Sequence, residues 1–547
     1  MISITSFFFS RDYFRGMKFT FTFLFCVAFA PIFAQEISIV EVENVALGGL
    51  QSFVHAEYAD NVIVFGGRLD GLHRRQPFAT FDIAGHNTGI QIWNTTTNSV
   101  NTYSTANFAD SLEEQIHSTN ANFTQDGEFL LVAGGYGYSA IAGDHVTFPR
   151  LIVFHLPTLI AALESNASLD ESIVFQSHHA DFAVTGGKLV KMDNLFYLIG
   201  GHRFDGRYNP MGPDHGPGFS QVYTNAIRRF EWSPNNGLNL LSQWTDANLL
   251  HRRDFNVLAG FNPATQQQNI SIYSGVFQLN NDIPYLNALE VSPQEFHEVP
   301  DFAQYYNHYH CGSFGLYNAQ NQKMAHYFFG GIAQYYDSLG VLVQDNNVPF
   351  VKTVAKVEQD VNGVWSEHLL PLQLPDYLGA GSEFIPAHDV TTYDNGVIQF
   401  DSNWANQDSI LMGYLYGGIK STAKNIFWDN EGDLSIAAPT LFAVYLHPNS
   451  SNGVMNNQSL NGWQMQVYPN PFNESIYLVL DLKSNTMVKV EWFDLQGKLI
   501  ETSLFENQSV GKHEYVFNEK SHWIGGTYLM TVTAEGKSFT QRIIFDD

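Results

Sequence analysis

The sequence predicts an all-β protein built from two folded units. Aromatic residues make up 14% of the 547-residue chain, charged residues only 15%, and there are 44 glycines. This balance is typical of chains with many short strands and tight turns. A strand motif that ends in a glycine pair recurs through most of the chain, and alternating apolar and polar residues with Asn and Gly turns fill the remainder.

The first segment, residues 1–34, has the features of a secretory signal. Basic residues precede an apolar run that ends at Ala34, and a small residue there suits cleavage. No later segment is apolar for long enough to predict a membrane-spanning helix. We therefore expect a mature chain that is exported to the periplasm and has no transmembrane segment.

The glycine-pair motif occurs six times, once in a degenerate form. The unit repeats every roughly fifty to ninety residues, which favours radial repetition of small sheets over a single sandwich. Glycine allows a sharp turn, or the close approach of a neighbouring strand, where a Cβ would clash. The copies are VIVFGG, FLLVAGG, LFYLIGG, ISIYSG, YFFGG and YLYGG, which end at Gly67, Gly135, Gly201, Gly275, Gly331 and Gly418.

These units resemble the blades of Kelch-type β-propellers. The later aromatic strand at Trp93 and the tryptophans Trp244 and Trp365 strengthen the resemblance. It implies a six-bladed Kelch-like β-propeller over residues 35–448, with four antiparallel strands in each blade. We expect residues 36–45 to supply the outer strand of the last blade beside residues 441–446, because this pairing would leave no long sheet edge exposed.

A histidine precedes each glycine motif and opens an apolar or aromatic stretch. We expect each histidine to begin the innermost strand of its blade, so that six imidazoles surround one mouth of the central channel. Kelch-like blades often carry a structural histidine near this position, so a ligand-lining role and a structural role both stay open. The six are His55, His117, His178, His251, His310 and His388.

Arginines cluster in the segments that share this mouth. Because the strands are antiparallel, the long connections after the glycine pairs return to the face where the histidines lie. Guanidinium groups there suit a carboxylated or sulfated ligand, and aromatics such as Phe78 and Tyr208 suit stacking on sugar rings. Alternatively, the arginines pair with the chain's own Asp205, Asp214 or Asp254. Seven of the eleven arginines after residue 34 lie in these segments: Arg68, Arg74, Arg75, Arg203, Arg207, Arg252 and Arg253.

The tail resembles the C-terminal sorting domain of type IX secretion cargo from Bacteroidetes-type bacteria. A polar linker (449–465) precedes residues 466–547, which carry VYPNP at 467–471, DLQGK at 494–498 and GTY at 526–528. The resemblance implies a small Ig-like antiparallel β-sandwich that the type IX machinery recognises. It also implies a protein that is released or attached to the outer cell surface, with a tail that is often removed.

These features predict a secreted binding module that recognises an anionic glycan or a surface protein at its His/Arg-rich face. The candidate ligand-binding residues are the six histidines together with Arg74, Arg75, Arg203, Arg207, Arg252 and Arg253. A net charge of −27 argues against nucleic acid as the partner.

The alternative is a carbohydrate-active lyase or glycosidase on the same face, since a lyase needs only a charge-neutralising Arg and a His or Tyr base. A minor alternative is a galactose-oxidase-like copper enzyme, which Tyr309-His310-Cys311 resembles. Cys311 is the only cysteine after residue 34 and would need a tyrosine partner from another blade. We expect no metal or other cofactor; an acidic loop at 429–433 departs from EF-hand spacing and is a weak calcium candidate.

Overall fold

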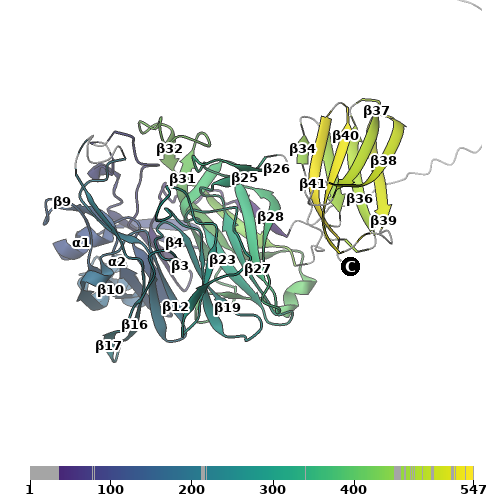
Figure 1. Ribbon diagram of the computed structural model, residues 1–547. Helices are drawn as coiled ribbons and strands as arrows, with labels where there is room; N and C mark the ends of the chain where they lie inside the picture. The colour runs from purple at the N-terminus through teal and green to yellow at the C-terminus, as the bar shows by residue number, and fades with distance from the viewer. Residues whose placement is uncertain are drawn as a thin grey trace, which may run out of the picture.

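The computed structural model describes residues 36–76, 78, 80–210, 216, 218–338, 341–448, 458–460, 463–468, 470, 472–473, 475–482, 484–493, 498–518, 523, 525–535 and 537–545. The expected leader (1–34) lies outside the described residues, as do most of the expected linker (449–465), Asp214, Pro469, Pro471 and residues 494–497. The larger unit comprises residues 36–448, and the smaller one begins at residue 458 (Figure 1).

Within the described part of the larger unit, the chain forms six successive antiparallel sheets, each with four main strands. Sheet 1 contains β2 (Val54–Tyr58), β3 (Asn61–Phe65), β4 (Gly89–Asn94) and β5 (Ser99–Ser104). Sheet 2 contains β6 (Asn122–Asp126), β7 (Phe129–Ala133), β10 (Arg150–His155) and β11 (Ile173–His178). Sheet 3 contains β12 (Lys188–Met192), β13 (Leu195–Ile199), β16 (Ala226–Ser233) and β17 (Gly237–Leu240).

The remaining three sheets follow the same pattern. Sheet 4 contains β19 (Asn256–Phe261), β20 (Gln268–Tyr273), β21 (Ala288–Val291) and β22 (Phe296–Glu298). Sheet 5 contains β23 (Ser313–Asn318), β24 (Lys323–Phe329), β27 (Thr353–Gln359) and β28 (Trp365–Gln373). Sheet 6 contains β29 (Tyr377–Pro386), β31 (Ile410–Ser421), β33 (Leu441–Leu446) and, from the start of the unit, β1 (Ile37–Glu41).

Shorter strands and helices accompany these six sheets. Three hairpins extend the connections after the second strands of sheets 2, 3 and 5: β8 (Tyr136–Ser139) with β9 (Asp144–Thr147), β14 (His202–Asp205) with β15 (Ser220–Tyr223), and β25 (Tyr335–Ser338) with β26 (Val341–Gln344). Additional strands are β18 (Trp244–Thr245), β30 (Ile398–Gln399) and β32 (Ser435–Ala437). The helices are α1 (Asp110–Ile116), α2 (Leu156–Ser165) and the 3₁₀ turns Ile83–Gly85, Asp170–Ser172, Ala180–Phe182 and Ser402–Asn406.

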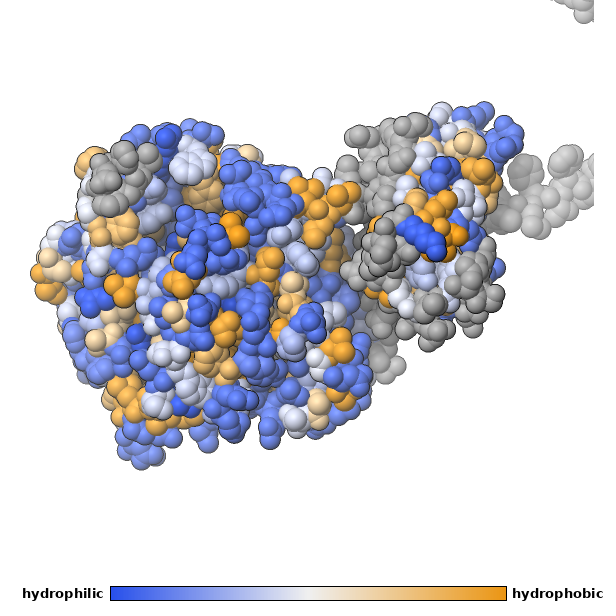
Figure 2. Space-filling model, in the orientation of Figure 1, coloured by the Kyte–Doolittle hydropathy of each residue, from blue (hydrophilic) through white to orange (hydrophobic). Residues whose placement is uncertain are grey.

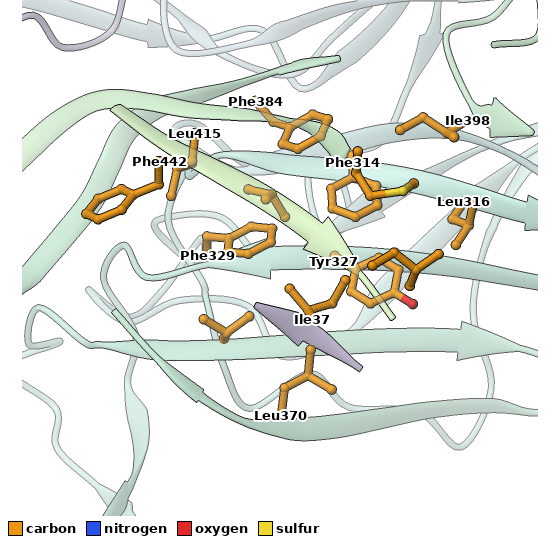
Figure 3. Close-up of a cluster of buried hydrophobic side chains, with 14 of the residues drawn as sticks. Ile37, Phe314, Leu316, Tyr327, Phe329, Leu370, Phe384, Ile398, Leu415 and Phe442 are labelled. Carbon is orange, nitrogen blue, oxygen red and sulfur yellow. The ribbon is translucent and has the colours of Figure 1, made fainter. Parts of the chain in front are cut away.

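The first strand of the unit closes the last sheet. β1 pairs antiparallel with β33, with Ile37 opposite Leu446 and Glu41 opposite Phe442. Ile37 is 1% exposed and lies among apolar side chains of sheets 5 and 6, which Figure 3 shows converging around it. The predicted closure of residues 36–45 on residues 441–446 is therefore confirmed, and the outer edge of β33 is covered.

A closed cycle of backbone hydrogen bonds joins the six sheets where their innermost strands begin. Each N–H of the cycle donates to the carbonyl of the ring residue of the preceding sheet, and Ser52 of sheet 1 donates to sheet 6, at distances between 2.7 and 3.2 Å. The donor–acceptor pairs are Ser52 to Gly381, Gly381 to His310, His310 to Asp254, Asp254 to Gly186, Gly186 to Asn120, and Asn120 to Ser52. We call these six residues the axial ring. Because the cycle closes on itself, the six sheets surround one axis.

The glycine pairs connect each sheet to the next one through a backbone hydrogen bond. The N–H of the second glycine in each pair donates to a carbonyl in the segment that leads into the following sheet, for example from Gly135 to Val184 at 2.9 Å. Both members of each pair have positive φ, and Ser274 takes the place of the first glycine in the degenerate copy. The same bond joins Gly418 of sheet 6 to Leu50, which precedes sheet 1. Apolar clusters fill the junctions between neighbouring sheets.

The smaller unit consists of two antiparallel sheets that share one core. One sheet contains β34 (Gln458–Leu460), β35 (Trp463–Tyr468), β36 (Ser475–Leu482) and β39 (Gly511–Asn518). The other contains β37 (Thr486–Phe493), β38 (Leu499–Gln508), β40 (Gly526–Ala534) and β41 (Lys537–Phe545). Trp492, which is 0% exposed, lies in a core to which strands of both sheets contribute.

The contacts of the glycine pairs lead to a stability prediction. Gly134 has φ +71°, and a Cβ there would lie 1.9 Å from the carbonyl oxygen of Val184. Gly143 in the same sheet's connection has φ +70° but no heavy atom within 4 Å of the Cβ position. We expect Gly143→Ala to cost about 1 kcal/mol of unfolding free energy for its left-handed backbone. Gly134→Ala should cost about 3 kcal/mol or more, because the clash adds to the same backbone cost.

Urea unfolding of both variants, followed by tryptophan fluorescence, measures this difference. Equal losses for the two variants would show that the backbone conformation alone matters and that the inter-sheet contact does not.

Candidate functional site

The axial ring narrows the axis at the end where the innermost strands begin. We call this end of the larger unit the ring face. The space on the axis at the ring is about 10 Å³, lined by Ser52, Asn120, Asp254, His310 and neighbouring residues. That volume holds about one water molecule. The ring residues therefore leave space for little more than one water molecule between them.

Charged side chains from different sheets meet beside the ring. Lys188 of sheet 3 lies with its Nζ 2.8 Å from His310 Nε2 and 3.2 Å from Glu383 Oε1. His310 Nε2 is also 2.8 Å from Glu383 Oε1. His55 of sheet 1 completes this group, packed edge-on against Phe123. We call Lys188, His310, Glu383 and His55 the axial ion cluster.

Burial and mutual charge set the protonation of this cluster. Burial alone would raise the pKa of Glu383, but Lys188 and His310 outweigh it and lower the pKa to about 2. Burial lowers the pKa of His55 to about 4, so its imidazole is neutral at pH 7. The side chains of Lys188 and Glu383 are only 19% and 11% exposed. The cluster is therefore a mostly buried ion pair that ties sheets 3, 5 and 6 together across the axis.

A second group gathers on the ring face around Arg253, the residue before Asp254 in the ring. Arg253 Nε donates to Tyr223 Oη at 3.0 Å, and its Nη1 donates to Asp254. The guanidinium also hydrogen-bonds Tyr309, which precedes His310 in the ring. Residues from the connections of sheets 1 and 3 complete the group, which we call the axial cup: His73, His202, Tyr208, Tyr223, Arg253 and Tyr309.

Aromatic contacts hold the cup together. The ring of His73 lies 4.9 Å from that of Tyr208, and His202 lies 5.6 Å from Tyr223. Burial lowers the pKa of His73 to about 4, and burial followed by the charge of Arg253 lowers the pKa of His202 well below its ordinary value. Burial raises the pKa of Tyr208. At neutral pH the cup thus combines the Arg253–Asp254 ion pair with the neutral imidazole of His202 and tyrosine hydroxyls, which can donate hydrogen bonds.

The structure brings only part of the predicted histidine set to the axis. His55 and His310 lie in the axial ion cluster. His251 lies near the cup, with its ring stacked 3.7 Å from that of Tyr223. His117 caps the C-terminal end of α1, five residues before the inner strand β6, and its Nε2 lies 2.7 Å from Thr105 Oγ1.

For His178 and His388 the predicted placement is wrong. His178 is the exposed last residue of β11, the outermost strand of sheet 2. The preceding apolar run at Ile173 forms that outer strand, and the inner strand of the next sheet begins only at Lys188. His388 is exposed and follows the C-terminal end of β29, so it lies at the opposite end of the inner strand from the ring.

The arginines divide into buried structural groups and exposed ones. Arg252 is 1% exposed, and its guanidinium donates to the carbonyls of Leu249, Ser274 and Asn287. The prediction that Arg252 contacts ligand is therefore wrong, because its guanidinium joins the segment that leads into β19 to the connection between β20 and β21. Arg68 is 2% exposed and is paired with Asp70.

The other arginines stay nearer to solvent. Arg207 Nε donates to the carbonyl of Thr80 at 2.7 Å. Arg203 is paired with Asp205 at 2.6 Å, and Arg75 donates to the carbonyl of Trp428 at 3.1 Å. Arg74 is exposed. The predicted self-pairing is thus observed for Arg203 with Asp205 and for Arg253 with Asp254.

Several members of these groups carry no repeat signal in the sequence. Lys188, Glu383, His73, His202 and Tyr223 were not among the predicted site residues. The ring offers a usable signal: four of its members are small polar or glycine residues with positive φ that stand directly ahead of an inner strand. Aligning the chain on those positions would have placed Lys188 two residues after a ring residue and Glu383 likewise.

The copper alternative depends on Cys311. This cysteine is 1% exposed, lies in a core cluster with Tyr273, and its Sγ is 3.8 Å from Asn256 Oδ1. The hydroxyl of Tyr273 is engaged with His326 Nδ1 at 2.7 Å. In the described residues, no group of three or more His, Cys, Asp or Glu side chains is placed to hold a metal ion.

Comparison with known proteins identifies the tail. Residues 466–546 match the family model of the secretion system C-terminal sorting domain. This match confirms the sorting domain predicted from the tail motifs. The protein is therefore secreted by the type IX system and is extracellular or located at the outer surface. None of the helices in the described part of the chain has the length and apolar character that a membrane crossing requires.

No curated protein matches the chain. Among solved structures, the chain is similar to YjhT at 10% identity, over 72% of this chain and 95% of that one, with a TM-score of 0.40. It is similar to a fungal alcohol oxidase of the AA5 family in complex with copper at 9% identity, over 94% and 100%, with a TM-score of 0.35. A Bacillus subtilis family 43 arabinoxylan arabinofuranohydrolase follows at 11% identity, over 91% and 96%, with a TM-score of 0.23. Likenesses this distant carry no argument about activity.

The axial ion cluster generates a prediction about pH. Because the pKa of Glu383 is lowered from 4.5 to about 2, its ionised form stabilises the fold above pH 4.5, and this contribution is lost as the pH falls toward 2. The lowering of the Glu383 pKa corresponds to about 3 kcal/mol of unfolding free energy. Glu383→Gln should be destabilised by about 3 kcal/mol at pH 7, because Lys188 then lacks its counter-charge. This deficit should shrink as the pH approaches 2.

Urea unfolding at pH 7, 4 and 2.5 measures the deficit, with the exposed Glu431→Gln as the matched control. A deficit that stays constant with pH would contradict an ionised Glu383 in the folded state.

Proposed function

We propose that the larger unit is a six-bladed β-propeller of Kelch type that acts as a binding module outside the cell, and that its axial cup recognises a carboxylate group. The closed axial ring and the six inter-sheet glycine bonds support the blade count. The paired sheets of the tail support an Ig-like sandwich that serves export. Arg253 at the centre of the cup is the observation that carries the function.

The chemistry of the cup favours a carboxylate over a neutral or cationic ligand. A guanidinium has five N–H donors, which exceed its three partners Tyr223, Asp254 and Tyr309. Hydrogen bonds between a guanidinium and a carboxylate are charge-assisted, and they are stronger where water is excluded. The Arg253 side chain is only 14% exposed, so a ligand carboxylate there would be largely desolvated.

The neighbouring groups add donors without adding charge. Tyrosine hydroxyls and the neutral imidazole of His202 can each donate one hydrogen bond to a carboxylate oxygen, whereas His73 donates its Nδ1–H to the carbonyl of Arg74. Because burial keeps His73 and His202 neutral at pH 7, they do not compete with Arg253 for the ligand's charge. The carboxylate belongs to an acidic glycan or to a protein, and both sources share this chemistry.

Catalysis is the second candidate, because the neutral imidazole of His73 beside Arg253 is the pair that a polysaccharide lyase uses as base and charge neutraliser. The two functions differ in turnover. A binding module leaves an acidic polysaccharide intact, whereas a lyase creates unsaturated ends that absorb ultraviolet light.

The test is binding of the secreted protein to acidic polysaccharides and acidic peptides, each compared with a carboxyl-blocked form. We expect binding to the free carboxylates only, and a tenfold to hundredfold loss in Arg253→Met, because a hydrogen bond to a charged group contributes about 1.5–3 kcal/mol. Arg203→Met, which removes an arginine whose side chain is 56% exposed and lies outside the cup, is the matched control and should bind normally.

Equal affinity for free and blocked carboxyl groups would refute carboxylate recognition. A rise in ultraviolet absorbance that Arg253→Met abolishes would replace the binding module with the lyase.

A further inference from the structure

Exposed apolar side chains are concentrated on the ring face of the larger unit. They lie in the connections that follow the second strand of each sheet, and each of the six connections supplies at least one among the described residues. We call them the crown: Leu69, Phe78, Ile83, Ile141, Val222, Leu279, Val341, Leu342, Trp428 and Ile436. Figure 2 shows an orange group at the upper right of the larger unit, near the place of β26 in Figure 1.

The opposite end of the unit differs. Among the described residues of its turns, the large exposed apolar side chains are Val361 and Val364, both in the turn between β27 and β28. Several crown residues are more exposed, for example Ile141 at 68% and Trp428 at 64%. Among the described residues of the larger unit, the other exposed large apolar side chains are Val40, Val174, Leu240 and Tyr305. Scattered apolar residues need no explanation, but a set gathered at one end marks an interaction surface.

The composition of the crown favours a protein as its occupant. Eight of the ten crown residues are aliphatic. A polysaccharide presents hydroxyl groups that lose hydrogen bonds to water on contact with Leu, Ile and Val tips, and this loss is unfavourable. Apolar side chains of a protein surface lose nothing of this kind, and their burial is favourable by about 25 cal/mol per Å².

The cup matches the centre of such an interface. Tyr, Trp and Arg are the residues most enriched among the positions that dominate protein–protein affinity, and those positions lie in the middle of an interface behind a rim that excludes water. The axial cup supplies Arg253 with three tyrosines at the axis, and the crown lies on the connections of all six sheets around it. A partner resting on the crown would shield the contact with Arg253 from solvent.

We infer that the crown docks a folded protein that presents a carboxylate, either an acidic side chain or a chain terminus, from an apolar surface into the axial cup. This inference rests on the proposed function and names the source of the carboxylate. It commits the crown to a protein partner, so a glycan partner is an outcome that would overturn it.

Sheet 5 offers a matched pair of variants for the test. Val341→Ser with Leu342→Ser removes crown residues of 55% and 43% exposure, and Val361→Ser with Val364→Ser removes residues of 41% and 59% exposure at the opposite end of the same sheet. Both pairs are exposed strand or turn positions, so neither should disturb folding. The probes are a displayed library of random peptides and an array of acidic and neutral glycans, each offered to the full secreted chain.

We expect the library to enrich peptides in which a carboxylate neighbours Leu, Ile or Phe. Their affinity should fall about tenfold in the crown variant, remain unchanged in the opposite-end variant, and fall in Arg253→Met. Enrichment of no peptide, or equal loss in both sheet 5 variants, would overturn the inference. Glycan binding that the crown variant does not affect would overturn it as well. If Arg253→Met abolishes carboxylate binding while the crown variant binds normally, the inference that the crown docks a protein is refuted, and carboxylate recognition by the cup is retained.

Discussion

The architecture of the larger unit depends on the axial ring of six backbone hydrogen bonds. Five of the six ring residues adopt positive φ; four of these stand just before an inner strand, and Gly381 lies within β29. Glycine, asparagine and aspartate tolerate that conformation better than most residues, which accounts for Gly186, Gly381, Asn120 and Asp254. Ser52 adopts it at a cost that its two ring bonds offset. Because each residue both donates and accepts, no member can move without loosening two sheets.

The ring also divides the axis into two environments with different chemistry. On one side, the axial ion cluster places Lys188, His310 and Glu383 in mutual contact, and the small space there leaves no room for a ligand. On the other side, the long connections of sheets 1 and 3 supply His73, His202, Tyr208 and Tyr223 of the cup. A buried ion pair contributes little net stability compared with apolar packing, but losing one partner is costly. The cluster therefore holds the register of three sheets, and recognition belongs to the ring face.

The sequence predicted the features that depend on backbone geometry better than those that depend on side-chain direction. Glycine pairs recur because only glycine fits where a Cβ would clash with the next sheet, so six copies of the motif could be recognised in the sequence. The positive φ of these glycines agrees with that explanation. The pairing of β1 with β33 could be predicted because it leaves no long strand edge unpaired. The histidines recur in the sequence but do not occupy equivalent positions in the sheets: His178 ends an outer strand and His388 follows an inner one. Arg252 and Arg253 are neighbours in sequence, yet the side chain of Arg252 is buried among backbone carbonyls and that of Arg253 contacts Tyr223 and Asp254 in the cup.

The overall charge of the chain changes how an acidic partner would be recognised. With a net charge of −27, the protein repels an acidic surface at distances beyond the cup, and salt screens that repulsion over about 10 Å. The contact with Arg253 acts only at short range and in a largely desolvated place, so salt weakens it less. The two effects oppose each other, and association is governed by repulsion while dissociation is governed by the cup and the crown. Electrostatic attraction thus selects the partner's carboxylate after contact, whereas apolar burial on the crown must supply most of the affinity.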